Sequence, residues 1–198
     1  SLSKLTPEQR RRAATMYKLD GQGRLSHDVM GPAPISPPRF SQGGGGLWST
    51  ADDYLRFARM LLADGEIDGV RVLSAESVRQ MRSDRLTDAQ KRIPFLGMPY
   101  WQGRGFGLNL AVVTDPTQST PLFGPGGVGS FTWPGAFGTW WQADPTADLI
   151  LIYLIQNAPD LGAQAGEAAA AIAGNTSVAK LRTAQPKFVR RTYQALDL

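Results

Sequence analysis

Residues 124–144 read Gly-Pro-Gly-Gly-Val-Gly-Ser-Phe-Thr-Trp-Pro-Gly-Ala-Phe-Gly-Thr-Trp-Trp-Gln-Ala-Asp. The stretch holds three of the five Trp residues and six of the 22 Gly residues of the chain. Glycine allows sharp bends and close backbone approach, and aromatic side chains at this density build an apolar wall with polar edges. The step Trp133-Pro134-Gly135-Ala136 lies between two β-like runs, which indicates a rigid bend at the lip of a cleft. The same composition also occurs in plain β-sheets, so the stretch alone leaves a purely structural bend open.

An antiparallel sheet is predicted around this stretch. Apolar residues alternate with others over residues 105–113, and further strand-like runs cover residues 128–133, 137–143 and 149–155. Residues 114–125 and 144–148 read as turns between them. The last run is almost continuously apolar, which is typical of a strand covered on both faces. The short connections favour an antiparallel meander.

The clearest predicted helix follows Thr50, whose side chain suits a helix N-cap. Tyr54, Phe57, Ala58 and Leu61 recur at helical spacing and form one apolar stripe, which we expect in the core. Gly65 is a suitable terminator. Three further helices are predicted: residues 7–17 after Thr6, residues 75–81 after Ser74, and the Ala-rich residues 163–173.

The whole chain, residues 1–198, is predicted to be a single partial domain. Residues 18–46 form a long loop region, rich in Gly and Pro and without clear periodicity, which is unusual in a compact domain. Such a loop is a functional cover or a piece whose packing partners lie elsewhere. Residues 177–198 form a basic C-terminal tail, apolar enough to dock as a short helix.

Composition excludes several classes of function. The net charge is only +4, and no dense basic run is interleaved with aromatic residues, so nucleic acid is not an expected partner. There is no Cys, and His27, the only histidine, lies in a loop-like stretch, so no metal site is expected. No apolar run reaches membrane-spanning length. The chain lacks an initiator Met, which indicates processing or truncation, and leaves a cytoplasmic and a periplasmic or secreted location equally open.

Three segments together resemble a known family. They are the Gly-rich residues 43–46 with Leu-Trp-Ser-Thr-Ala-Asp-Asp at 47–53, Gly-Phe-Gly-Leu at 105–108, and the stretch at 124–144 with its Asp-Pro step at 144–145. In this order they resemble the C-terminal half of the serine β-lactamase-like superfamily, which includes class C β-lactamases, penicillin-binding proteins, D-aminopeptidases and related carboxylesterases. The resemblance implies an α+β fold, with an antiparallel sheet and flanking helices in a partial β-lactamase-like α/β/α sandwich.

The family's chemistry needs three motifs: a Ser-x-x-Lys, a Tyr-x-Asn or Ser-x-Asn, and a Lys-Thr-Gly or related motif on a strand at the cleft edge. By resemblance, Trp133, Pro134 and Gly135 stand where the third motif stands and bind substrate. Ala136 then supplies a backbone N–H to the oxyanion hole. A Trp in place of the Lys removes a cation and adds an apolar wall, which favours the esterase-like members. Pro134 fits an edge position because it has no N–H to give a sheet.

The other two motifs are not convincing in this chain. Ser-x-x-Lys occurs at residues 1–4 and 177–180, and we interpret both as coincidences because a pattern with two free positions arises easily by chance. No Tyr begins a Tyr-x-Asn. The nucleophile, its base and the second motif are therefore expected upstream of Ser1.

The sequence leaves three functions open. The chain is the C-terminal portion of a serine hydrolase, inactive alone, that cleaves ester or amide bonds, β-lactams among them, through an acyl-enzyme. It is otherwise a non-catalytic binding or scaffold domain with the same fold, or one part of an enzyme completed by another chain. No cofactor is expected. The expected partners are the missing N-terminal half or a second copy of the chain, since the piece should expose strand edges.

Overall fold

The computed structural model describes residues 5–19, 24–27, 47–95, 98–158 and 177–198. A five-stranded antiparallel sheet lies at the centre, with its strands in sequence order. These strands are β5 (Arg104–Phe106), β6 (Ala111–Val113), β7 (Phe131–Thr132), β8 (Trp140–Asp144) and β9 (Leu149–Tyr153). The predicted antiparallel meander is confirmed.

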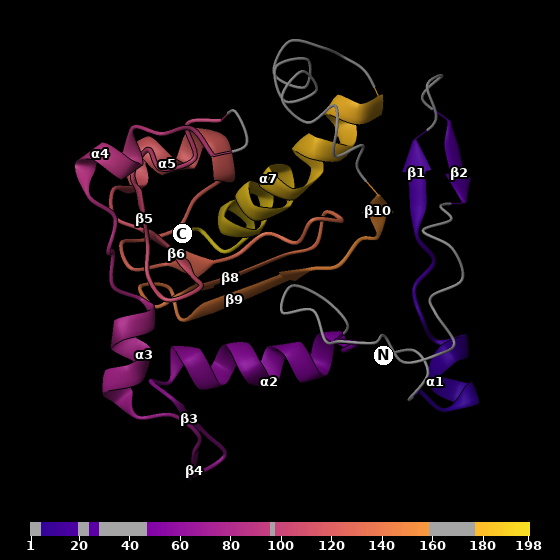
Figure 1. Cartoon of the computed structure of the whole chain (residues 1–198), viewed down its shortest axis with the longest axis horizontal. Coiled ribbons are helices and arrows are strands. Elements are labelled where there is room, and N and C mark those ends of the chain that lie inside the picture. The colour runs from indigo at the N-terminus through magenta and orange to yellow at the C-terminus, as the bar shows by residue number, and fades with distance from the viewer. Residues whose placement is uncertain (1–4, 20–23, 28–46, 96–97, 159–176) are drawn as a thin grey trace.

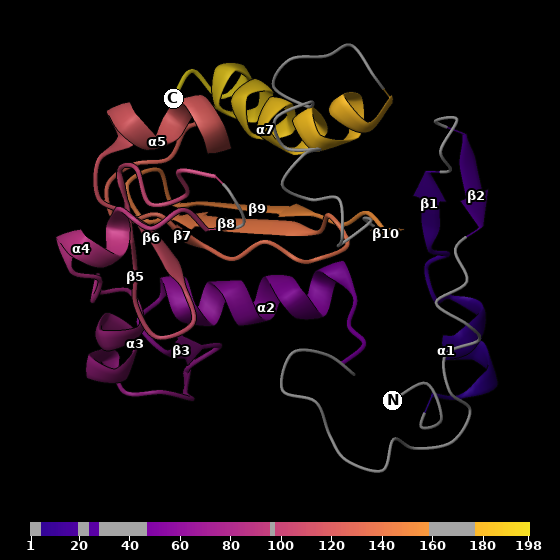
Figure 2. The same cartoon turned by 45° about the horizontal axis from the view of Figure 1, so that its top comes forward.

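Helices cover both faces of this sheet. Figure 2 shows the sheet edge-on, with α2 (Ala51–Leu62) on one side and α5 (Pro116–Phe123) and α7 (Ser177–Ala195) on the other. Shorter elements surround these layers: β3 (Glu66–Ile67), β4 (Val70–Arg71), α3 (Ala75–Met81) and α4 (Asp88–Lys91). The α+β class and the helix–sheet–helix layering are as expected.

A small second sheet stands beside this body. It joins β1 (Tyr17–Leu19), β2 (Leu25–His27) and β10 (Asn157–Ala158), with β1 between the other two. Figure 1 shows β1, β2 and the short helix α1 (Pro7–Arg11) apart from the five-stranded sheet. The sheet falls partly within the predicted loop region 18–46, so that prediction is wrong for the described part, and His27 lies on a strand rather than in a loop.

The strand β8 explains why the core has two parts. Consecutive side chains of a strand point to opposite faces of its sheet, and all five residues of β8 are buried. Trp141 packs with Ala58, Leu61 and Phe131 in the cluster between α2 and the sheet. Trp140 packs in the other cluster, which contains Phe123 of α5 and Val189 and Tyr193 of α7.

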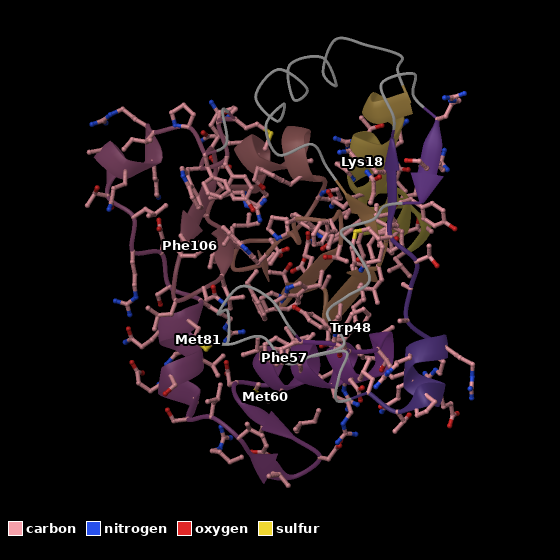
Figure 3. The ribbon with its side chains drawn as sticks, turned by 45° about the vertical axis from the view of Figure 1, so that its right-hand side comes forward. Lys18, Trp48, Phe57, Met60, Met81 and Phe106 are labelled. Carbon is pink, nitrogen blue, oxygen red and sulfur yellow. The ribbon has the colours of Figure 1, made fainter. Side chains whose placement is uncertain are left out.

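The helix caps are where the sequence places them. Thr50 accepts a hydrogen bond from the Asp53 N–H, and Ser74 accepts one from the Ser77 N–H. Thr6 and Gln9 form a reciprocal capping box. The predicted core positions of α2 are correct for Ala58 and Leu61 but wrong for Phe57, which is 42% exposed. Met60, which was not predicted in the core, is buried; Figure 3 labels both Phe57 and Met60.

Several predicted boundaries are wrong. The helix expected at 7–17 ends at Arg11, because the chain turns to form β1. The single strand expected at 105–113 is the hairpin of β5 and β6, in which Asn109 adopts the left-handed φ of +67° that Asn tolerates. The turn expected at 114–125 contains α5, which Asp115 caps and Pro116 opens at N1.

The C-terminal tail is more regular than expected. Residues 177–198 contain the 19-residue helix α7, and Val189 and Tyr193 are its buried contacts with the sheet. The helix expected at 163–173 lies outside the described residues.

Candidate functional site

The bend predicted at the cleft lip is a tight turn between β7 and β8. After Thr132 the chain leaves the ladder, and the Gly138 N–H donates to the Gly135 carbonyl oxygen at 3.1 Å. The Gly135 N–H donates to the Thr139 carbonyl oxygen at 2.8 Å, which closes the hairpin. Gly138 has a φ of +87°, a conformation that glycine adopts without a steric penalty. A Cβ at Gly135 would lie 1.8 Å from Thr139 Oγ1, so this position has room only for glycine.

Ala136 lies at the tip of this turn and is exposed. Among the described residues, no protein acceptor receives a hydrogen bond from its N–H. The hydrogen bonds of Gly135 and Gly138 hold the peptide unit on both sides of it. A fixed N–H without a protein acceptor can stabilise a negatively charged oxygen without reorganising.

The sequence suggested an edge position for Pro134, but the residue is not at an edge of the sheet. It follows β7, which lies between β6 and β8 in the interior of the sheet. Thr132 is the last β7 residue paired with either neighbour. The missing N–H of Pro134 therefore costs the sheet nothing, because the residue stands just beyond the ladder.

Trp133 contributes a half-buried ring beside the turn. Its ring centre lies 5.1 Å from that of Phe106 on β5, 5.8 Å from Phe95 and 6.1 Å from Tyr100. Phe106 is labelled in Figure 3. The rings meet at angles of 54–62°, which is the tilted-to-edge range that aromatic pairs prefer. Trp133 is thus held on several sides by other rings.

The neighbours of Trp133 were not predicted as site residues. Phe95, Tyr100 and Trp101 lie in the connection before β5, and Phe106 was interpreted as a strand residue within the family-like segment 105–108. The aromatic density of residues 95–106 was the available signal. It does not reveal which distant ring these side chains meet.

A buried cation lies behind this group of rings. Arg104 on β5 is 1% exposed, and its guanidinium carbon lies 4.1 Å from the Phe123 ring centre and 5.3 Å from that of Tyr100. Within the described ranges it has no carboxylate partner, and its Nε and Nη1 atoms have no hydrogen-bond acceptor. Burial lowers the pKa of Arg104 and raises that of Tyr100.

The described residues hold no alternative catalytic centre of a familiar kind. Ser177, the first residue of one Ser-x-x-Lys pattern, begins α7, and residues 1–4, the other pattern, lie outside the described ranges. No group of three or more His, Asp or Glu side chains suited to a metal ion occurs in the part of the chain that the structure describes. In that same part of the chain, no helix has both the length and the apolar character needed to cross a membrane.

Residues 3–175 match the family model described as Beta-lactamase. The chain belongs to this family. Two proteins of Mycobacterium tuberculosis are each 72% identical to it over 194 residues: the uncharacterized protein MT1414 of strain CDC 1551 and protein Rv1367c of strain H37Rv. The alignments cover 98% of the chain but only 48% of each relative, so the chain spans about half their length.

Several solved structures share the fold. A LovD6 mutant of simvastatin synthase from Aspergillus terreus aligns with a TM-score of 0.63 at 20% identity, over 96% of the chain and 44% of that protein. EstCE1, described as a hydrolase with promiscuous acyltransferase activity, aligns with a TM-score of 0.55 at 21% identity, over 85% of the chain and 43% of that protein. A penicillin-binding protein homolog from Caulobacter crescentus aligns with a TM-score of 0.50 at 18% identity, over 78% of the chain and 42% of that protein. The family resemblance of the three sequence segments is confirmed.

Proposed function

We propose that the chain is the C-terminal portion of a serine hydrolase that cleaves ester or amide bonds, β-lactams among them, through an acyl-enzyme. The observation that carries the proposal is the N–H of the exposed residue Ala136, held in a tight turn and without a protein acceptor among the described residues. By resemblance, Ala136 directly follows the position of the family's third motif, residues 133–135. The nucleophile and its base belong to the N-terminal half, outside this chain.

In the proposed reaction, a serine hydroxyl from the N-terminal half attacks the substrate carbonyl carbon, and a lysine takes the hydroxyl proton. The carbonyl oxygen becomes a tetrahedral oxyanion and accepts a hydrogen bond from the Ala136 N–H. The C–O or C–N bond then breaks, and the leaving group takes the proton. Water attacks the resulting acyl-serine and releases the acid. Loss of one oxyanion donor typically costs about 10²–10³-fold in kcat.

Three observations support this function and its esterase-like form. The relatives are about twice as long as the chain, as expected if the missing motifs lie in the remainder. At the position of the family's Lys, Trp133 offers an aromatic surface with no cation for a substrate carboxylate. EstCE1, which shares the fold, is described as a hydrolase with promiscuous acyltransferase activity.

The test is complementation of the two halves. This chain and the N-terminal half, prepared separately, are assayed with a chromogenic short-chain ester, each alone and after mixing. We expect hydrolysis only in the mixture. A complete enzyme assembled from two natural chains would give the same result, and copurification of the halves from the source cell separates that case.

A non-catalytic binding or scaffold domain is the second candidate. It is favoured by the lack of a serine–lysine pair at the turn among the described residues. If the mixture refolds to one species, binds an ester analogue and hydrolyses nothing, the scaffold is correct and the hydrolase proposal fails.

A further inference from the structure

Five aromatic side chains form one cluster that includes Trp133, three residues before Ala136. We call Phe95, Tyr100, Trp101, Phe106 and Trp133 the aromatic wall. They come from three separate parts of the chain: the connection before β5, β5 itself, and the residue that follows β7. No single stretch of sequence would build this surface, so it exists only in the folded protein.

The wall is continuous and stiff. Trp101 lies 5.8 Å from Phe106, Phe95 lies 5.2 Å from Tyr100, and Tyr100 lies 4.9 Å from Trp101, as ring-centre distances. Together with the contacts of Trp133, every ring touches at least two others. Tyr100 is buried and forms the base of the wall, while the other four rings are half-buried and keep part of their surface open.

Three charged residues next to the wall are neutralised or withdrawn. Asp84 accepts a hydrogen bond from the Phe106 N–H at 3.2 Å, but its carboxylate is paired with the Lys91 ammonium group at 2.5 Å. Arg104 lies behind Tyr100 and is buried. The exposed parts of the rings therefore present an apolar surface without a free charge of either sign from these three residues.

The wall also adjoins the proposed oxyanion donor. Trp133 and Ala136 are three residues apart, so their backbones lie within about 11 Å of each other. For the rings to contact the substrate, an ester whose carbonyl oxygen reaches the Ala136 N–H must extend one of its two substituents along them. A long apolar substituent would there exchange water contacts for ring contacts.

We propose that the aromatic wall is a subsite for an uncharged apolar group of the substrate, either an acyl chain of about four to eight carbons or an aromatic ring. This inference rests on the proposed hydrolase function and specifies its substrate class. The group belongs to the acyl or to the alcohol portion of the ester, and the assay below separates these two sources.

The experiment measures kcat/KM of the full protein, this chain together with the N-terminal half, on two ester series. One series lengthens the acyl group from acetate to octanoate with a constant alcohol, and the other lengthens the alcohol with a constant acetyl group. We expect kcat/KM to rise about fourfold per methylene in one series and to stay flat in the other. The rising series identifies the portion that contacts the wall.

Variants tie the preference to the wall. Phe106→Leu removes ring area and is expected to reduce the gain per methylene, and Trp133→Lys should reverse the preference toward an ester that carries a carboxylate. Phe57→Leu is the matched control, because Phe57 is a partly exposed ring on α2 that packs on the other face of the sheet. Thermal unfolding confirms that each variant folds.

The outcomes separate the two proposals. Flat or falling kcat/KM in both series, or a preference unchanged by Phe106→Leu and Trp133→Lys, overturns the subsite while the hydrolase function stands. Absence of hydrolysis of every ester overturns both.

Discussion

The hydroxyl of Tyr193 holds the last helix to the sheet, and its removal should measurably destabilise the protein. Tyr193 on α7 donates to Asp144 Oδ2 at 2.5 Å, and Asp144 is the last residue of β8 and is 1% exposed. The same carboxylate accepts from the Gly127 N–H at 2.8 Å and from both the N–H and the hydroxyl of Thr146. Gln142 donates to the Tyr193 hydroxyl at 3.2 Å. One buried carboxylate thus connects the helix, the strand and the glycine-rich loop.

Tyr193→Phe removes one hydrogen bond to a buried charge and leaves the rings packed. A hydrogen bond to a charged group contributes about 1.5–3 kcal/mol. The remaining donors to Asp144 stay in place, so we expect a loss of about 2 kcal/mol in the free energy of unfolding. For a chain of this size that corresponds to a fall of about 4–8 °C in Tm.

The loss should depend on pH. Burial alone would raise the pKa of Asp144, but the hydrogen bonds from Tyr193, Gly127 and Thr146 outweigh it and hold the pKa below its usual value. A lowered folded-state pKa stabilises the protein above the unfolded-state value of about 3.9 and loses this effect as the pH falls through the folded-state value. The difference in the free energy of unfolding between the wild type and Tyr193→Phe should therefore be full near pH 7 and become smaller in acid.

The assay is thermal and urea unfolding of both proteins between pH 3 and pH 7. Tyr153→Phe is the control, because Tyr153 packs its ring on Phe188 and no protein partner of its hydroxyl occurs in the described ranges. The control should change the free energy of unfolding by less than about 0.5 kcal/mol. A Tyr193→Phe effect no larger than that of the control, or a gap that widens in acid, would refute the reasoning.

Three further predictions follow from other contacts. Arg104→Met should stabilise the protein by about 1–4 kcal/mol in urea unfolding. The reason is that a buried charge without a described carboxylate partner costs more free energy than a flexible apolar side chain among rings. Destabilisation would mean that the guanidinium has an ionic partner. Gly135→Ala should cost about 1–3 kcal/mol because of the contact with Thr139 Oγ1, and Thr139→Ala in the same protein should restore most of the loss; an additive double variant contradicts this. The chain alone should self-associate in sedimentation velocity, because β9 pairs only with β8 among the described strands and carries no charge to protect its free edge; a monodisperse monomer at high concentration would count against it.

Local rules accounted for much of the fold. The caps at Thr6, Thr50 and Ser74 depend on hydroxyls within a few residues of the amides that they serve, so their positions follow from short sequence patterns. The meander was predictable because its strands follow one another with short connections. The ends of the strands were predicted less accurately. Asn109 carried a turn signal and Pro116 a helix-start signal, but the prediction followed the simple alternation of apolar residues instead.

The surroundings of the site were not predictable in the same way. The turn at Gly135 and Ala136 is a local feature and was found from a motif. The rings that surround Trp133 come from residues 95–106, and their meeting depends on how β5 and its preceding connection pack in three dimensions. The burial of Arg104 was equally invisible, because charged residues on an edge strand are usually exposed.

The central claim is that the Ala136 N–H stabilises the oxyanion, and one atom exchange tests it directly. Replacing Ala136 with L-lactic acid in the full protein changes the amide N–H to an ester oxygen and keeps the methyl side chain. Ester hydrolysis by this protein and by the unmodified one is compared, with Tm as the check on folding. We predict that kcat falls about 10²–10³-fold while Tm changes little. An unchanged kcat would contradict the assignment of Ala136 as the oxyanion donor.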